Sequence, residues 1–182
     1  MTGACKDVLA DLLSKFGRPK IIARTIPVEA GKIRENWKVA AWVAGGLVFD
    51  ETGQVALVRH HADSGWEDVW VPPGGTLEEG ETADDGFRRE VREETGLEVK
   101  DLHVTRIFNN AYAEPNGKRY PFYFVQFLAR AATHELKPDD HEVRKARWFK
   151  TLPRDMAFRE DYVEDFRTLR GKPRGSDPPQ TT

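Results

Sequence analysis

GTLEEGETADDGFRREVREETGL, residues 75–97, is the stretch of the chain that decides the fold class. Thr82 can cap the first turn of a helix, Asp85 completes a capping box, and Gly96 is typical of a helix end. An apolar row between the two ends can face a sheet: Ala83, Phe87 and Val91. The spacing therefore predicts an amphipathic helix that begins near Thr82 and ends before Gly96.

Three carboxylates, Glu90, Glu93 and Glu94, project from about a third of the circumference of this helix. Like charges at these spacings destabilise an exposed helix by about 0.2 to 0.5 kcal/mol per pair, and a divalent cation would reverse that penalty. Oxygen-only ligands favour magnesium or manganese over zinc. Such an ion on a pyrophosphate would neutralise charge and activate water. The alternative is solvated surface charge paired with neighbouring arginines.

The full spacing pattern favours the metal site. Its order is Gly, five residues, Glu, seven residues, then Arg-Glu-apolar-x-Glu-Glu-x-Gly-apolar. The chain meets every position of this pattern, at Gly75, Glu81, Arg89, Glu90, Val91, Glu93, Glu94, Gly96 and Leu97. A chance match to its specified residues is on the order of 10⁻⁸ at a given start. The stretch resembles the signature of the Nudix hydrolase family.

The resemblance implies an α/β fold, a Nudix-type α/β/α sandwich with a mixed β-sheet and a loop-helix-loop catalytic motif. It also includes WVPPGG at residues 70–75 and RWF at residues 147–149, so that residues 40–150 are covered. The implied function is a divalent-metal-dependent hydrolase that cleaves a phosphoanhydride bond in a nucleoside diphosphate linked to another group. Nucleoside triphosphates, nucleotide sugars, ADP-ribose and dinucleoside polyphosphates all stay open as substrates.

By resemblance, Glu90 and Glu94 are the principal ligands of Mg²⁺, with Mn²⁺ as the alternative ion. Glu93 is either a further ligand or the base that deprotonates the attacking water. Arg89 is expected to orient a glutamate through a charge-assisted hydrogen bond. The backbone of Gly75 can approach a phosphate or ligate metal through its carbonyl, or simply make a tight turn. Glu81 is expected to brace the loop.

Further candidate residues lie outside the signature. Glu142 stands in a loop from which some members of the family supply an extra metal-binding or catalytic carboxylate; the alternative is a solvated loop charge. Tyr112 can stack on a nucleobase, although aromatic residues in strands more often belong to the core. Lys118 and Arg119 precede a predicted strand and can meet a phosphate or simply end a hairpin. The adjacent histidines 60–61 point to opposite faces of a strand, which favours packing over a joint metal site.

The rest of the chain predicts three segments: an N-terminal helix and extended extension at 1–38, a Nudix hydrolase domain at 39–170 and a flexible tail at 171–182. The apolar stripe of the first helix can pack on the domain or form a homodimer. Strands are predicted at 40–49, 54–59, 97–108, 119–131 and 144–149. A last helix is expected to bury Tyr162, Val163, Phe166 and Leu169.

Composition limits the partners. With 28 basic and 30 acidic residues, the net charge of −2 predicts neither a stable nucleic-acid partner nor a membrane. The family resemblance implies a small nucleotide substrate. Cys5 is the only cysteine, which excludes an internal disulfide and is consistent with the cytoplasm. No signal peptide is predicted from the N-terminal residues, which carry several charges. A nucleotide-sensing module and an isomerase on the same scaffold are the competing functions.

Overall fold

The computed structural model describes residues 3–33, 38, 41–61, 68–139 and 141–171. Ten helices and strands occur in this part of the chain. They are α1 (Gly3–Phe16), β1 (Lys20–Pro27), β2 (Ala41–Phe49), β3 (Val55–His60), β4 (Gly74–Thr76), α2 (Ala83–Thr95), β5 (Val99–Ala113), β6 (Arg119–Ala131), β7 (Val143–Phe149) and α3 (Arg159–Gly171). The predicted tail lies almost entirely outside the described residues.

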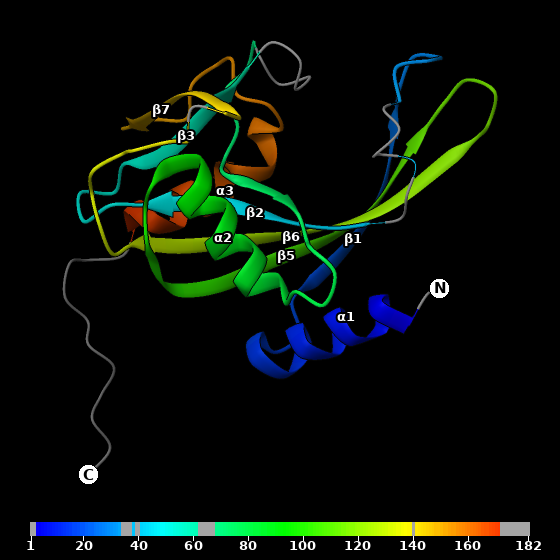
Figure 1. Ribbon diagram of the computed structural model, residues 1–182, viewed down its shortest axis with the longest axis horizontal. Helices are drawn as coiled ribbons and strands as arrows, with labels where there is room; N and C mark the ends of the chain where they lie inside the picture. The colour runs from blue at the N-terminus through cyan, green and yellow to red at the C-terminus, as the bar shows by residue number, and fades with distance from the viewer. Residues whose placement is uncertain (1–2, 34–37, 39–40, 62–67, 140, 172–182) are drawn as a thin grey trace.

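One mixed sheet forms the centre of the molecule (Figure 1). Its strand order is β1-β5-β6-β2-β3-β7, and β4 pairs separately with β2. The pairs β1–β5 and β2–β6 are parallel, whereas β5–β6, β2–β3, β2–β4 and β3–β7 are antiparallel. The prediction of a mixed sheet with flanking helices, the α/β/α sandwich, is confirmed.

Helix α2 has the two ends that its sequence predicts. The Thr82 side chain accepts a hydrogen bond from the backbone N–H of Asp85, which satisfies one of the free donors of the first turn. Gly96 has a φ of 73°, the left-handed conformation that favours glycine, and its N–H donates to the Arg92 carbonyl. The helix between these caps presents Phe87 and Val91 to the sheet.

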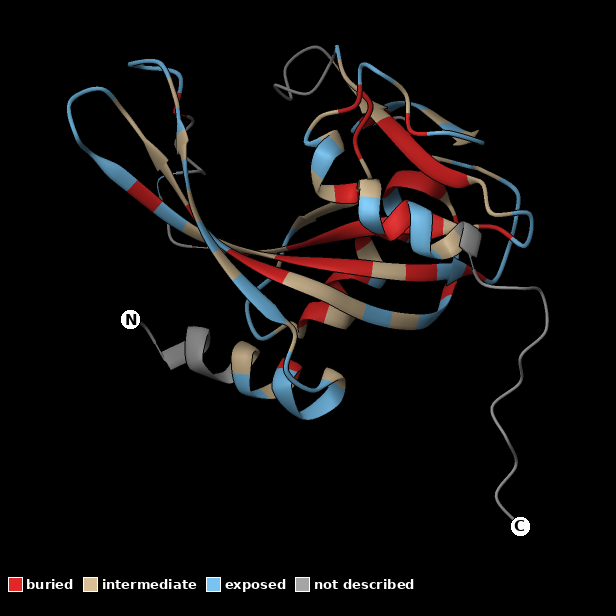
Figure 2. Ribbon diagram, turned by 180° about the vertical axis from the view of Figure 1, so that it is seen from behind, coloured by how far each residue is buried: buried red, intermediate tan, exposed pale blue. Residues whose placement is uncertain are grey.

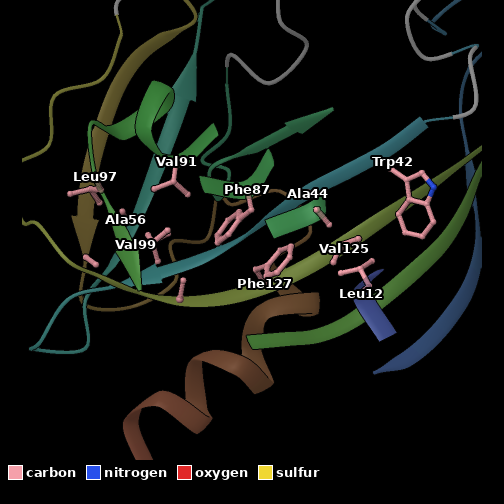
Figure 3. Close-up of a cluster of buried hydrophobic side chains, with 14 of the residues drawn as sticks. Leu12, Trp42, Ala44, Ala56, Phe87, Val91, Leu97, Val99, Val125 and Phe127 are labelled. Carbon is pink, nitrogen blue, oxygen red and sulfur yellow. The ribbon is translucent and has the colours of Figure 1, made fainter. Parts of the chain in front are cut away.

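The core on the α2 side is built from both helices that cover this face of the sheet. Phe87 of α2 stacks on Phe127 of β6, with ring centroids 4.8 Å apart, and Phe16 of α1 meets Phe127 edge-on. Leu12 of α1 is fully buried in the same cluster. Figure 3 shows this cluster, with Leu12, Trp42, Ala44, Phe87, Val91 and Phe127 among its labelled side chains. Helix α1 therefore packs on the domain, one of its two predicted arrangements.

Helix α3 covers the opposite face. Tyr162 and Phe166 are buried, with Val163 and Leu169 packed beside them, as the sequence predicts. A polar network also holds the helix to the sheet, because the Asp165 carboxylate accepts hydrogen bonds from Gln126 and Arg106, each at 2.5 Å. The three layers are thus α1 and α2, the sheet, and α3.

Strands β5 and β6 run well beyond the body as a long hairpin, with β1 along one side (Figure 1). Burial is concentrated where these strands cross the body, and the hairpin tip is exposed (Figure 2). β5 is longer than predicted and reaches Ala113, because its outer half pairs with both β1 and β6. No helix in the described part of the chain is long and apolar enough to cross a membrane.

Candidate active site

Arg89 organises the carboxylates of α2. Its guanidinium donates to Glu81 Oε1 at 2.9 Å, to Glu90 Oε1 at 2.8 Å and to Glu93 Oε2 at 3.1 Å. It also donates to the backbone carbonyl of Thr76 at 3.1 Å, which ties the helix to β4. The hydrogen bond that Arg89 donates to the Glu81 carboxylate holds the pKa of Glu81 below its usual value. One arginine therefore fixes the positions of three glutamates and of the loop that faces them.

Glu94 is the most deeply buried carboxylate of the site, with 2% of its surface exposed. Its Oε2 accepts the backbone N–H of Gly74 at 2.8 Å, and its Oε1 lies 3.1 Å from Nε2 of His60 at the end of β3. Burial, followed by the nearby charge of Glu90, raises the pKa of Glu94 well above its usual value. Both carboxylate oxygens thus have defined partners in spite of the unfavourable burial.

Glu90 lies directly against Gly75 of β4. A Cβ added at residue 75 would stand only 2.3 Å from Glu90 Oε1 and 2.5 Å from its carboxyl carbon. The absence of a side chain at Gly75 therefore lets the carboxylate approach the loop backbone. Burial raises the pKa of Glu90, against the opposing hydrogen bond from Arg89.

Glu93 and Glu142 are the exposed members of the group. The Glu93 side chain is half exposed and lies on the same face of α2 as Glu90, where both reach Arg89. Glu142 is close enough for its charge to raise the pKa values of Glu90 and Glu94. Its backbone carbonyl also accepts the N–H of His61 at 3.2 Å. The structure thus gathers every carboxylate named from the sequence into one region.

The residues present fit a hard divalent ion. Among the described residues, no three His, Cys, Asp or Glu side chains form a metal cage by themselves. Magnesium, however, usually keeps several waters and takes only one or two protein carboxylates together with substrate phosphates. Glu90 and Glu94 supply buried oxygen donors of this kind, beside a glycine that keeps the loop backbone close to Glu90.

A cavity of about 230 Å³ adjoins these carboxylates. Its near wall includes His60 and Gly74, which contact Glu94, and Gly75, which lies against Glu90; Thr76 follows them on β4. Its floor is the face of the sheet that carries Tyr112, Phe122 and Phe124. The first residues of α3 and the preceding Phe158 close the far side. The cavity therefore adjoins the carboxylate site and is lined by several aromatic side chains together with the Arg24–Asp161 ion pair.

The other predicted substrate contacts divide into two groups. Tyr112 lines the cavity and stacks on Phe122 at a centroid distance of 4.6 Å. Lys118 and Arg119 do not line it, because they lie near the tip of the β5–β6 hairpin. There Lys118 stands over the Tyr120 ring and Arg119 donates to the Thr25 hydroxyl.

Several residues of the site and cavity were not assigned there from the sequence, among them the polar Arg24, His60, Asn110 and Asp161. Asn110 could have been found from the alternation of residues along β5, because it is a polar residue between Phe108 and Tyr112 on one face of that strand. No local sequence pattern points to Arg24, because its position depends on the pairing of β1 with β5. His60 was expected to pack in a loop, whereas it contacts Glu94.

Comparison with known proteins gives the family. The family model described as the NUDIX domain matches residues 40–161, which is more than half of the chain. The protein belongs to the Nudix hydrolase family.

Nudix hydrolase 5 from Arabidopsis thaliana is 31% identical over 107 residues, covering 57% of this chain and 34% of that protein. The NAD-capped RNA hydrolase NudC from Vibrio parahaemolyticus is 41% identical over 105 residues, covering 55% of this chain and 36% of its own length. The chain thus spans about a third of the length of these two relatives. A MutT NUDIX hydrolase structure from Burkholderia pseudomallei shares the fold, with a TM-score of 0.54, 18% identity and coverage of 71% of this chain and 95% of that one.

Proposed function

We propose that this protein is a divalent-metal-dependent pyrophosphohydrolase that cleaves a phosphoanhydride bond in a nucleoside diphosphate linked to another group. The observation that carries the proposal is the pair of buried carboxylates, Glu90 and Glu94, beside the glycines of β4 and at the edge of an aromatic cavity. Buried acids with raised pKa values destabilise a fold, and such groups concentrate at functional sites.

Glu90 and Glu94 would hold magnesium or manganese, and the Gly75 carbonyl is a further candidate ligand. When bound, such an ion would neutralise phosphate charge and activate water. Glu93 is exposed on the same face of α2, so it is placed to accept the proton of the attacking water or to serve as a further ligand. Arg89 orients Glu90 and Glu93, and Glu142 adds negative charge beside them.

The cavity would hold the nucleoside, with Tyr112 among its contacts, while the phosphates reach the loop at Gly74 and Gly75. Lys118 and Arg119 are not part of this arrangement, because they lie near the hairpin tip. A homodimer and a cytoplasmic location remain predictions from the sequence.

The test incubates the full chain and magnesium with a nucleoside triphosphate, ADP-ribose, a nucleotide sugar, a dinucleoside polyphosphate and NAD. NAD belongs in the panel because one relative is named as an NAD-capped RNA hydrolase. Mass spectrometry in ¹⁸O-labelled water is expected to find nucleoside monophosphate and a phosphorylated second fragment, one of them labelled. Tight nucleotide binding without any product would instead identify a sensing module.

Glu94→Gln is the matched variant. It keeps the shape of the side chain and is expected to lower kcat on the order of 10³-fold, because the variant lacks an anionic ligand. Glu98→Gln makes the same change at an exposed residue and is expected to leave kcat unchanged. Near-normal turnover by a folded Glu94→Gln protein would refute the proposal.

A further inference from the structure

The floor of the cavity carries a row of residues from three adjacent strands. In the register of the sheet, Arg24 of β1 is paired with Asn110 of β5, and Asn110 with Phe122 of β6. All three residues line the cavity. β1 lies outside the residues that match the family domain, so that part of the cavity is a feature of this chain's own N-terminal segment.

Asn110 has an unusual hydrogen-bonding state. Its side-chain Oδ1 accepts a hydrogen bond from Arg24 Nε at 2.8 Å. Its Nδ2 is buried and has no hydrogen-bond partner among the described residues, although only 1% of Asn110 is exposed. Buried polar groups are nearly always paired, so an unpaired amide donor on a residue that lines the cavity points to an acceptor on a ligand.

The orientation of this amide is fixed. Arg24 cannot turn away easily, because its guanidinium donates to Asp161 Oδ2 at 2.6 Å and lies 4.2 Å from the centre of the Phe108 ring. A rotation of the Asn110 amide would place its NH₂ group against the Arg24 Nε–H, two donors facing each other. The unpaired group of the Asn110 amide is therefore an N–H donor and not an acceptor.

We propose that Asn110 determines specificity: the cavity accepts a nucleotide ring that presents a carbonyl oxygen and disfavours one that presents an amino group there. The inference rests on the proposed function, since it assumes that the substrate carries a nucleoside. The aromatic side chains of Phe122 and Phe124 favour a planar ring, and the Asn110 N–H selects its edge. An amino group on the ring would face the Asn110 N–H, so that both donors would stay unpaired. Polar sites discriminate most strongly between ligands when the wrong ligand leaves buried groups unpaired in this way.

Inosine and adenosine substrates form the decisive pair, because a 6-carbonyl replaces a 6-amino group on the same purine. With the second group of the substrate held constant, kcat/KM is expected to favour inosine by at least about tenfold. Inosine monophosphate is likewise expected to bind more tightly than adenosine monophosphate when binding is measured by calorimetry without metal. Equal values for the two purines, or a preference for adenosine, would overturn the inference.

Asn110→Asp sharpens the test. A carboxylate can still pair with Arg24 through one oxygen and offers the ring an acceptor through the other, so the preference is expected to invert toward adenosine. Asn110→Leu removes the polar group and is expected to bring the ratio close to one. Asn109→Asp is the matched control, since Asn109 is exposed and its side chain is on the opposite face of β5. A ratio equal to that of the wild type in both Asn110 variants would contradict the inference.

Arg24 acts through Asn110 as a positioning residue. Arg24→Lys keeps a positive charge beside Asp161 but lacks the guanidinium, so KM for the inosine substrate is expected to rise without a change in kcat. The outcomes also separate the two proposals. Selective binding of inosine monophosphate without any turnover would refute the proposed hydrolase activity and support the role of Asn110 in specificity. Turnover without a purine preference would support the hydrolase activity and refute the role of Asn110.

Discussion

The carboxylate site and the cavity meet at Gly74 and Gly75 but differ in almost every physical respect. The first concentrates charge: buried Glu90 and Glu94 have raised pKa values, and Arg89 compensates only part of this charge. The second has aromatic side chains and one balanced ion pair, between Arg24 and Asp161, and the unpartnered amide donor of Asn110 is neutral. The difference teaches that the cost of burying carboxylate charge falls on the side where we place the chemistry, whereas the cavity side carries one unpaired neutral donor.

This division implies that mutations on the two sides should have separable effects. Changes at the carboxylates should act on kcat, because they alter charge that is needed at the reacting phosphate. Changes in the cavity should act on KM and on the choice of substrate, because they alter contacts made before and during reaction alike.

The largest difference is expected between two glycine substitutions. In Gly75→Ala the new methyl group would stand 2.3 Å from Glu90 Oε1, so the carboxylate must move, and kcat is expected to fall by about 10². In Gly45→Ala the methyl group would meet Phe124 at 3.1 Å in the cavity floor, so KM should rise by less than about tenfold with little change in kcat. Steady-state kinetics distinguish the two, and equal losses of kcat would break the comparison.

An intermediate effect concerns stability. In metal-free protein, Glu94→Gln is expected to raise the melting temperature by at least about 2 °C at neutral pH, because the variant no longer buries a charge. A carboxyl group whose pKa is raised by folding stabilises the fold below the unfolded pKa of 4.5 and loses this contribution as pH rises through the folded value. The advantage of the variant should therefore appear above pH 4.5, grow with pH and then level off.

Calorimetry from pH 4 to pH 8 with a chelator measures this prediction, with Glu98→Gln as the exposed control. A Glu94→Gln protein that melts below the wild type at neutral pH would show that the contacts of Glu94 with Gly74 and His60 outweigh its burial.

The smallest effect is expected at the hairpin tip. Lys118→Ala removes a charge that stands over the Tyr120 ring, away from the cavity, so kcat/KM should change by less than about twofold. Measurement across the substrate panel checks this. A tenfold loss with one substrate would mean that the hairpin reaches the phosphates and that the site extends further than the cavity.

The parts of the fold that depend on neighbouring residues could be predicted from the sequence. Thr82 and Gly96 mark the ends of α2 because caps act within one turn, and the carboxylates share a face because helical spacing places them there. β6 was predicted with the bounds that it has, since its aromatic and β-branched residues have a strong strand preference.

The cavity could not be predicted in this way, because it depends on contacts between distant segments. Arg24 and Asn110 are 86 residues apart, and the ion pair of Arg24 with Asp161 spans 137 residues. No local sequence pattern predicts the parallel register of β1 with β5 or the packing of α3 beside the cavity. Lys118 and Arg119 were likewise named from local sequence alone, and the structure places them near the hairpin tip and not along the cavity.

The parallel pairing of β1 with β5 also affects the order in which the chain folds. Contacts between residues far apart in the chain form slowly, because the entropy of a large loop must be lost before they are made. The turns of α2, in contrast, need only residues that are close in sequence. We expect the helix that carries the carboxylates to be structured early and β1 to dock late. The final docking event would then also be the one that puts the Arg24 guanidinium against Asn110, so selectivity would be acquired last.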